Sequence, residues 1–125
     1  MSVVSKTIKY LLDKNISVST AESCTGGLLA AEFTAVSGIS KIYKTGLITY
    51  SNDSKIKNLK VKPSTIKRYG AVSRQVCAQM CLHLHKISKS QLTFSTTGVA
   101  GPKGCLLYTS PSPRDVEEAR MPSSA

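Results

Sequence analysis

Apolar residues recur along this chain with two different periods, and the alternation between those periods predicts the order of its elements. A spacing of three to four residues predicts amphipathic helices, whereas strict alternation or a short β-branched run predicts strands. Helices are expected over residues 3–13, 26–36, 53–59, 63–69 and 74–87. Strands are expected over residues 16–20, 43–51 and 91–96. This alternation predicts an α/β fold, a layered α/β/α domain with a mixed or mostly parallel sheet.

The end of the first predicted strand carries the most suggestive chemistry, because residues 20–27 read TAESCTGG. A turn over residues 21–25 is expected to present a hydroxyl and a thiol side by side before the next helix. Ser23 suits nucleophilic attack there, since a sharp turn exposes its hydroxyl and the N–H groups of Thr25 and Gly26 could form an oxyanion hole. The glycines could instead offer bare backbone N–H groups to an anion such as a phosphate.

A nucleophilic serine needs a base, and the best candidates follow the second predicted strand. Tyr50 ends that strand, and Lys55 lies five residues later in the next predicted helix. Lys55 can act as a base only when burial or positive neighbours lower its pKa from about 10.4 toward neutrality. Tyr50, placed between the lysine and Ser23, could relay the proton. Both histidines lie on the long helix, away from these loops.

Ordinary structural roles compete with each of these assignments. From the residues alone, a helix cap is the more frequent role for Ser23. Tyr50 could be a buried aromatic residue and Lys55 a solvated one. Cys24 is an alternative nucleophile without a histidine partner, and neither the P-loop nor the dinucleotide-binding pattern occurs in the chain.

The three loops that leave the predicted strands are expected to meet. They follow Thr20, Tyr50 and Thr96, and the last of them is the glycine-punctuated stretch TGVAGP over residues 97–102. Ligands of α/β folds bind at the carboxyl ends of the strands, so this convergence predicts a binding site.

The charge and composition of the chain indicate which classes of binding partner are expected. The chain carries 17 Lys and Arg against 7 Asp and Glu, a net charge of +10. The lysines are scattered, which favours attraction of an anionic small molecule over nucleic-acid binding. No apolar run approaches the roughly 18–20 residues of a membrane span, and the N-terminus lacks a secretory core. We therefore expect a cytoplasmic protein with no membrane association, and self-association is left open.

The cysteines do not predict a metal site. Cys77 and Cys81 lie four residues apart, with two histidines following. On a helix, however, both cysteines share a face with Val76, Met80 and Leu84, which is the stripe expected in the core. Buried thiols are therefore expected, with no metal bound.

Four motifs together resemble one known family. They are TAESCTGGLLAAEFTAVSGIS, GLITYSNDSKIKNLKV, GAVSRQV and TTGVAGP, and they closely resemble the CinA C-terminal-domain family over about residues 5–104. The resemblance implies a nicotinamide-nucleotide amidase of pyridine nucleotide salvage, which hydrolyses nicotinamide mononucleotide to nicotinate mononucleotide and ammonia without a metal or other cofactor. It implies Ser23 as the nucleophile, with Tyr50 and Lys55 as proton-transfer and activating groups. The expected substrate-binding residues are Thr25, Gly26, Gly27, Thr97, Gly98 and Gly101.

The last part of the chain departs from the family. Residues 105–125 are proline- and serine-rich and are similar to translated adapter or vector sequence, so a disordered tail is expected after a domain over residues 1–104. That domain would lack the last strands and helix of the family and would leave a sheet edge open. We expect the parent protein to be an amidase and this chain to be poorly active or inactive. Because the first helix begins near Met1, a stand-alone protein is expected.

Three functions give different expectations for the structure. An amidase requires the side chains of Ser23, Tyr50 and Lys55 to meet in one cleft, within a hydrogen-bond distance of about 2.6–3.2 Å of one another. A non-catalytic nucleotide-binding module would keep the glycine loops but turn Lys55 to solvent. A DNA-associated competence factor would show a continuous basic face.

Overall fold

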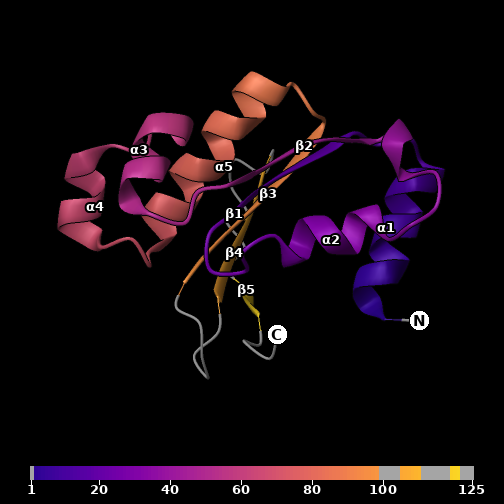
Figure 1. Cartoon of the computed structure of the whole chain (residues 1–125), viewed down its shortest axis with the longest axis horizontal. Helices are drawn as coiled ribbons and strands as arrows, with labels where there is room; N and C mark the ends of the chain where they lie inside the picture. The colour runs from indigo at the N-terminus through magenta and orange to yellow at the C-terminus, as the bar shows by residue number, and fades with distance from the viewer. Residues whose placement is uncertain (1, 99–104, 111–118, 122–125) are drawn as a thin grey trace.

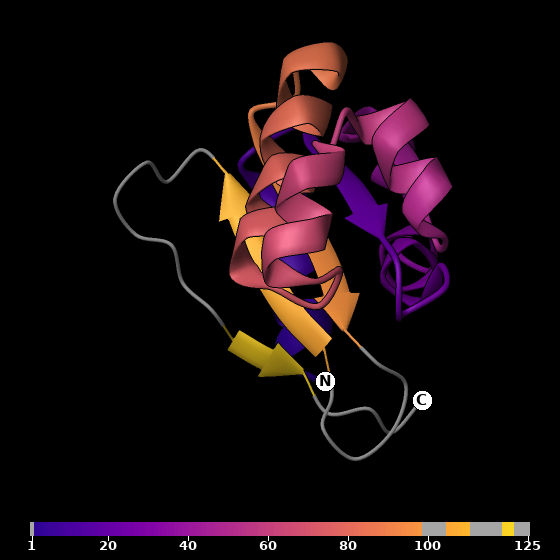
Figure 2. The same cartoon turned by 90° about the vertical axis from the view of Figure 1, so that its left-hand side faces the viewer.

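The structure is a computed structural model that describes residues 2–98, 105–110 and 119–121. Within these residues, helices lie on both faces of a five-stranded sheet (Figures 1 and 2). The helices are α1 (Val3–Asp13), α2 (Leu28–Thr34), α3 (Asn52–Leu59), α4 (Pro63–Tyr69) and α5 (Arg74–Ser88), with a 3-10 turn η1 (Ile39–Lys41). The strands are β1 (Val18–Glu22), β2 (Tyr43–Ile48), β3 (Leu92–Gly98), β4 (Cys105–Ser110) and β5 (Ala119–Met121).

The sheet is mixed, which confirms the expected fold class. Its strand order is β2-β1-β3-β4-β5, in which β1 pairs in parallel with both β2 and β3. Strand β4 pairs antiparallel with β3 and with β5. Because β1, β2 and β3 are parallel, their carboxyl ends meet at one edge of the sheet, where a binding site is expected.

Helix boundaries follow local chemistry. Ser73 caps α5, its hydroxyl accepting a hydrogen bond from the Val76 N–H at 3.2 Å. Pro63 begins α4, and Gly70 ends it with a φ of 81°, a conformation that glycine adopts readily. Within the described part of the chain, no helix is both long and apolar enough to cross a membrane.

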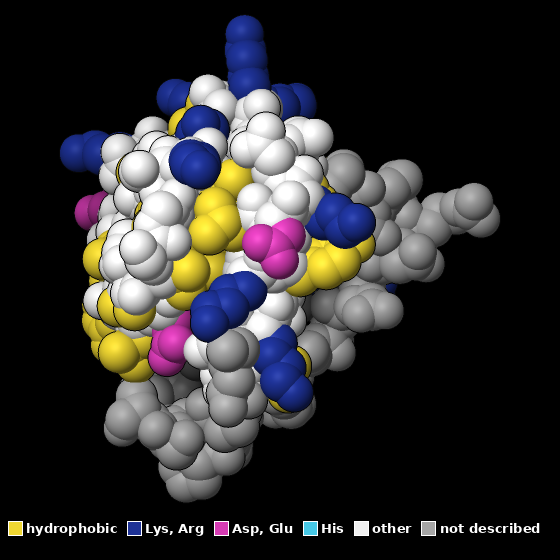
Figure 3. All heavy atoms as spheres, turned by 90° about the vertical axis from the view of Figure 1, so that its right-hand side faces the viewer, with side chains coloured by type: hydrophobic (Ala, Val, Ile, Leu, Met, Phe, Trp, Pro, Cys, Tyr) yellow, Lys and Arg dark blue, Asp and Glu magenta, His cyan; other side chains and the backbone are white. Residues whose placement is uncertain are grey.

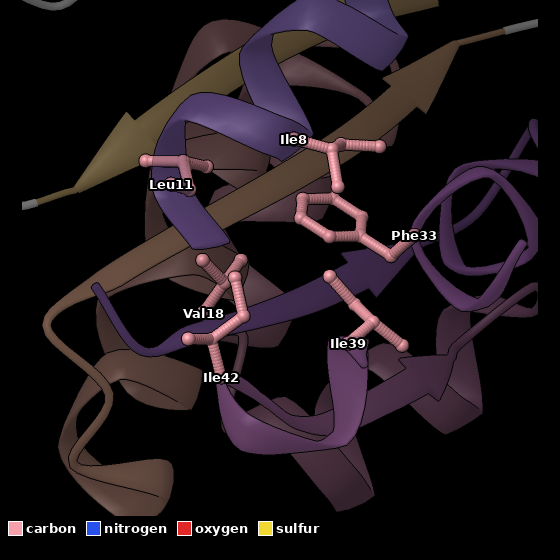
Figure 4. Packing of buried hydrophobic residues seen from close by; sticks show 6 residues of the cluster. All are labelled: Ile8, Leu11, Val18, Phe33, Ile39 and Ile42. Carbon is pink, nitrogen blue, oxygen red and sulfur yellow. The ribbon is translucent and has the colours of Figure 1, made fainter. Parts of the chain in front are cut away.

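Two hydrophobic clusters lie on opposite faces of the sheet, because successive side chains of a strand alternate between its faces. Val18 of β1 belongs to the first cluster, which joins α1, α2 and η1 (Figure 4). The first cluster contains Ile8, Leu11, Val18, Phe33, Ile39 and Ile42. Ala21 of β1 belongs to the second, which joins α3 and α5 and contains Ala21, Leu59, Val61, Val76, Met80 and Leu84.

The cysteines of α5 pack against β3, as the helical stripe predicted. The Cys81 thiol donates to the carbonyl oxygen of Thr93 at 3.2 Å, and Cys77 Sγ lies 3.3 Å from Ser95 Oγ. Both cysteines are buried. Among the described residues, no group of His, Cys, Asp and Glu is arranged to hold a metal ion.

Two strands extend further than the sequence predicted. Strand β1 continues through Ala21 and Glu22, which were expected in a turn, because Glu22 still pairs with Ile48 of β2. Strand β3 continues through Thr97 and Gly98, which were expected in a loop, because both pair with β4. The carboxyl ends of β1 and β3 are therefore determined by pairing with strands that are distant in the sequence. The local pattern of apolar and polar residues does not predict them.

The expected disordered tail differs from the structure over Cys105–Ser110, which form β4. This strand pairs along Thr93–Gly98, so the edge of β3 that was expected to be open is covered. Tyr108 is 6% exposed and packs in a cluster with Cys77 and Cys81. Its burial explains why a segment rich in polar and proline residues contributes a strand. Residues 111–118 and 122–125 lie outside the described residues.

Candidate active site

Ser23 and Lys55 meet in a buried site at the carboxyl edge of the sheet. The Lys55 Nζ lies 2.9 Å from Ser23 Oγ, and the two side chains are 2% and 5% exposed, respectively. Ser23 directly follows β1, so alternation along the strand turns it toward the face that carries α3. The pair that the sequence proposed is therefore brought within hydrogen-bond distance.

Helix α3 explains why a lysine is buried here. Ser51 caps the helix by accepting from the Ser54 N–H at 3.0 Å, which fixes where the first turn begins. Lys55 and Leu59 are four residues apart and share the buried face of α3. Side chains in a helix point back toward its N-terminus, so the amine of Lys55 reaches the loop between β2 and α3.

The surroundings of the Lys55 amine consist of one hydroxyl and two carbonyl groups. Nζ lies 3.0 Å from the backbone oxygen of Thr49 and 3.0 Å from that of Tyr50, in addition to Ser23. Burial lowers the pKa of Lys55 below its ordinary value, because removal from water penalises the ammonium form. Lys55 is therefore not the solvated residue that was considered as an alternative. Ser23 is likewise not a simple helix cap.

Glu22 is a functional candidate that the sequence reasoning did not single out. It is 1% exposed and points to the opposite face of the sheet from Ser23, where it meets the start of α2. Its carboxylate accepts from the Thr25 hydroxyl and from three backbone N–H groups, those of Gly27 (3.2 Å), Leu29 (2.8 Å) and Ala30 (2.9 Å). Glu22 lies six residues before Leu28, the first residue of α2, so no local sequence signal marks this contact.

These bonds change the expected role of the glycine turn. The Gly26 N–H donates to the Ser23 carbonyl at 3.0 Å, and the Gly27 N–H donates to Glu22. Both groups therefore have acceptors inside the protein, and the start of α2 is closed by a carboxylate, not open to a phosphate. Thr25 joins two strands through its hydroxyl, which also lies 2.9 Å from Thr96 Oγ1. Its backbone N–H has no acceptor among the described residues.

A cavity of about 220 Å³ opens over the serine and the lysine. It is lined by Ser23, Cys24, Tyr50, Asn52, Lys55, Ala71, Thr97 and Gly98. Segments that follow or end β1, β2 and β3 all contribute, as the convergence of their loops predicted. Tyr50 is 68% exposed, and its backbone carbonyl, not its phenol, contacts Lys55.

The other expected substrate-binding residues divide into two groups. Thr97 and Gly98 line the cavity as the last residues of β3, and the Thr97 hydroxyl donates to the Ala71 carbonyl at 2.9 Å. That bond fixes the cavity wall between β3 and the segment before α5. Gly101 lies outside the described residues.

Comparisons with known proteins agree with this residue pattern. A family model described as the CinA C-terminal domain matches residues 1–107. Proteins named as competence-damage inducible from Clostridium novyi (strain NT) and Acetivibrio thermocellus are 52% and 48% identical to this chain over 96 residues. The alignment covers 77% of this chain and 23% of each relative, so the chain spans less than a quarter of the length of these relatives.

Solved structures agree with the fold. A competence-damaged protein (CinA) superfamily protein from Enterobacter cloacae superposes with a TM-score of 0.86 at 27% identity, covering 100% of this chain and 81% of that one. The competence/damage inducible protein CihA from Agrobacterium tumefaciens has a TM-score of 0.80 at 32% identity, covering 98% and 83%. The names of these proteins refer to competence and damage and state no reaction.

Proposed function

The chain belongs to the CinA C-terminal domain family, and we propose that its site hydrolyses a carboxamide with Ser23 as nucleophile and Lys55 as base. The proposed substrate is nicotinamide mononucleotide, and the products are nicotinate mononucleotide and ammonia. One observation carries the proposal, the buried contact of 2.9 Å between Lys55 Nζ and Ser23 Oγ.

The three contacts of Nζ fit either charge form of the lysine, because an ammonium would donate to all three oxygens. The proposal takes the neutral form. A neutral amine has two N–H donors and one lone pair, and a carbonyl oxygen can only accept. The carbonyls of Thr49 and Tyr50 therefore take the two N–H groups. The lone pair is left for the third neighbour, the Ser23 hydroxyl, which is the only one of the three that has a proton to give. The lowered pKa of Lys55 favours this same form.

The proposed reaction follows from that arrangement. Ser23 Oγ attacks the carboxamide carbon while Nζ takes its proton, and the N–H of Thr25 is the donor proposed to stabilise the oxyanion. Lys55, now an ammonium, returns the proton to the leaving nitrogen, so the C–N bond breaks and ammonia departs. A water molecule, deprotonated by the amine, then hydrolyses the acyl-serine ester to release the carboxylate and restore Ser23.

The competing functions fit the site less well. A nucleotide-binding module was expected to turn Lys55 to solvent, yet this side chain is 2% exposed. A DNA-associated factor was expected to present a continuous basic face. On the face drawn in Figure 3, lysine and arginine side chains are separated by hydrophobic and uncharged surface, with acidic side chains among them. The net charge of +10 suits a small anionic substrate.

Two measurements on the full chain test the proposal. A fluorophosphonate probe should label Ser23 covalently, and labelling should be lost in Ser23→Ala. Ammonia release from nicotinamide mononucleotide should depend on the same serine. Ser90→Ala is the matched control, because Ser90 is a buried serine, 3% exposed, that precedes β3 at the end opposite to the cavity. Labelling or ammonia release that persists in Ser23→Ala would refute the proposal.

A further inference from the structure

Tyr50 occupies an unusual position for a large aromatic residue. Its backbone carbonyl lies 3.0 Å from the amine of Lys55, so its main chain is tied to the base. Its side chain is nevertheless 68% exposed while it lines the cavity over Ser23. An aromatic side chain therefore lines the same cavity as the nucleophile and is largely exposed within the part of the chain that the structure describes.

The size of the cavity indicates how a substrate would use that face. Pockets that enclose a whole small molecule measure about 300–1,000 Å³, whereas this cavity measures about 220 Å³. A carboxamide group can reach Ser23 inside it, but the ring that carries the carboxamide must lie near the mouth. Among the described residues that line the cavity, Tyr50 is the one with an aromatic ring.

We propose that the ring of Tyr50 is a stacking platform that selects carboxamides carried on a cationic aromatic ring. This inference rests on the proposed function and names a specificity-determining residue of the same site. In an N-ribosylated pyridine carboxamide the ring is a pyridinium cation, which is attracted to the face of a tyrosine. A cation at this place would also favour the neutral form of Lys55, because like charges disfavour the ammonium. An aliphatic amide would gain neither effect.

A binding experiment tests the platform without turnover. The chain contains no tryptophan, so Tyr50→Trp in a Ser23→Ala background introduces a single fluorophore at the mouth of the cavity. Titration with nicotinamide mononucleotide should quench its fluorescence saturably, through stacking of the pyridinium on the indole. Tyr69→Trp is the matched control, since Tyr69 is 44% exposed at the end of α4 and does not line the cavity. Equal, non-saturating quenching in both variants would overturn the inference.

Kinetics separate the platform from the proton relay considered for the same residue. Tyr50→Phe keeps the ring and should change kcat and KM by less than about twofold, whereas Tyr50→Ala should raise KM roughly 5- to 30-fold, as expected for losing a cation–π contact. A large loss of kcat in Tyr50→Phe with KM unchanged would overturn the platform in favour of the relay.

The two proposals can fail separately. Saturable quenching without Ser23-dependent ammonia release would support the platform and refute the amidase. Ammonia release that depends on Ser23 but is unchanged in KM by Tyr50→Ala would refute the platform and leave the amidase standing.

Discussion

A buried acid and a buried base lie back to back at the carboxyl edge of the sheet, and their surroundings are opposite. Glu22 faces α2 and is surrounded by donors: one hydroxyl and three backbone N–H groups. Lys55 faces the other side and is surrounded by two carbonyl oxygens and the Ser23 hydroxyl. All of these hydrogen-bond partners, around both Glu22 and Lys55, are neutral groups.

The difference fits a structural role for Glu22 and the chemical role proposed for Lys55. Four donors meet the carboxyl group of Glu22, which holds the turn against α2. Two carbonyls and a hydroxyl accommodate either form of the amine, and burial lowers the pKa of Lys55 toward the neutral form. Because Glu22 and Ser23 are adjacent in the chain, the fixed acid also positions the nucleophile.

The largest effect is expected from Lys55→Met, which keeps the length of the side chain and removes the base. Labelling of Ser23 and ammonia release should fall by about 100-fold or more, the usual contribution of a general base. The free energy of unfolding should change by less than about 3 kcal/mol, because the carbonyls of Thr49 and Tyr50 lose a donor while a desolvated amine is removed. Lys57→Met, at an exposed position of the same helix, is the control and should change neither quantity.

The same variant gives a pH test of stability. A lysine whose pKa is lowered by folding binds fewer protons in the folded than in the unfolded state between its two pKa values. The free energy of unfolding of the parent chain, relative to Lys55→Met, should therefore rise with pH between the pKa of Lys55 in the fold and about 10.4. Chemical denaturation over that range measures it, and a flat difference would show that Lys55 is not desolvated.

A smaller effect is expected from Glu22→Gln. One oxygen of the carboxylate accepts from three groups, and the other accepts from the Ala30 N–H. In glutamine an NH₂ group replaces one of these oxygens, so its N–H donors would face donors of the protein. The free energy of unfolding should fall by about 1–3 kcal/mol, measured by chemical denaturation. Thr25→Val removes a single donor and should cost about 1 kcal/mol. A cost for Thr25→Val that exceeds the cost for Glu22→Gln would contradict the role assigned to the carboxylate.

Local sequence signals were enough to predict much of this arrangement. Pro63, Gly70 and Ser73 mark helix ends by their own chemistry, and the structure follows them. The expected cap of α3 was Asn52 or Asp53, but the structure has Ser51 there. The pairing of Ser23 with Lys55 could be proposed because parallel strands bring their carboxyl ends together.

What the sequence did not predict depends on non-local contacts. The donors around Glu22 come from the start of α2, so its role appears only when β1 is known to run to Glu22. The strand over Cys105–Ser110 depends on pairing with β3 and on the burial of Tyr108. Neither the contacts of Glu22 nor the strand over Cys105–Ser110 is marked by a hydrophobic periodicity or a turn motif in the sequence.

The ionisation of Lys55 tests the central claim most directly. The ¹⁵N chemical shift of its Nζ, followed by NMR as the pH is raised, reports when the amine loses its proton. The account predicts that Lys55 titrates below the exposed lysines of the chain, and that the rate of Ser23 labelling rises with pH through the same midpoint. Titration of Lys55 together with the exposed lysines would contradict the account, because the amine would then be charged when Ser23 needs a base.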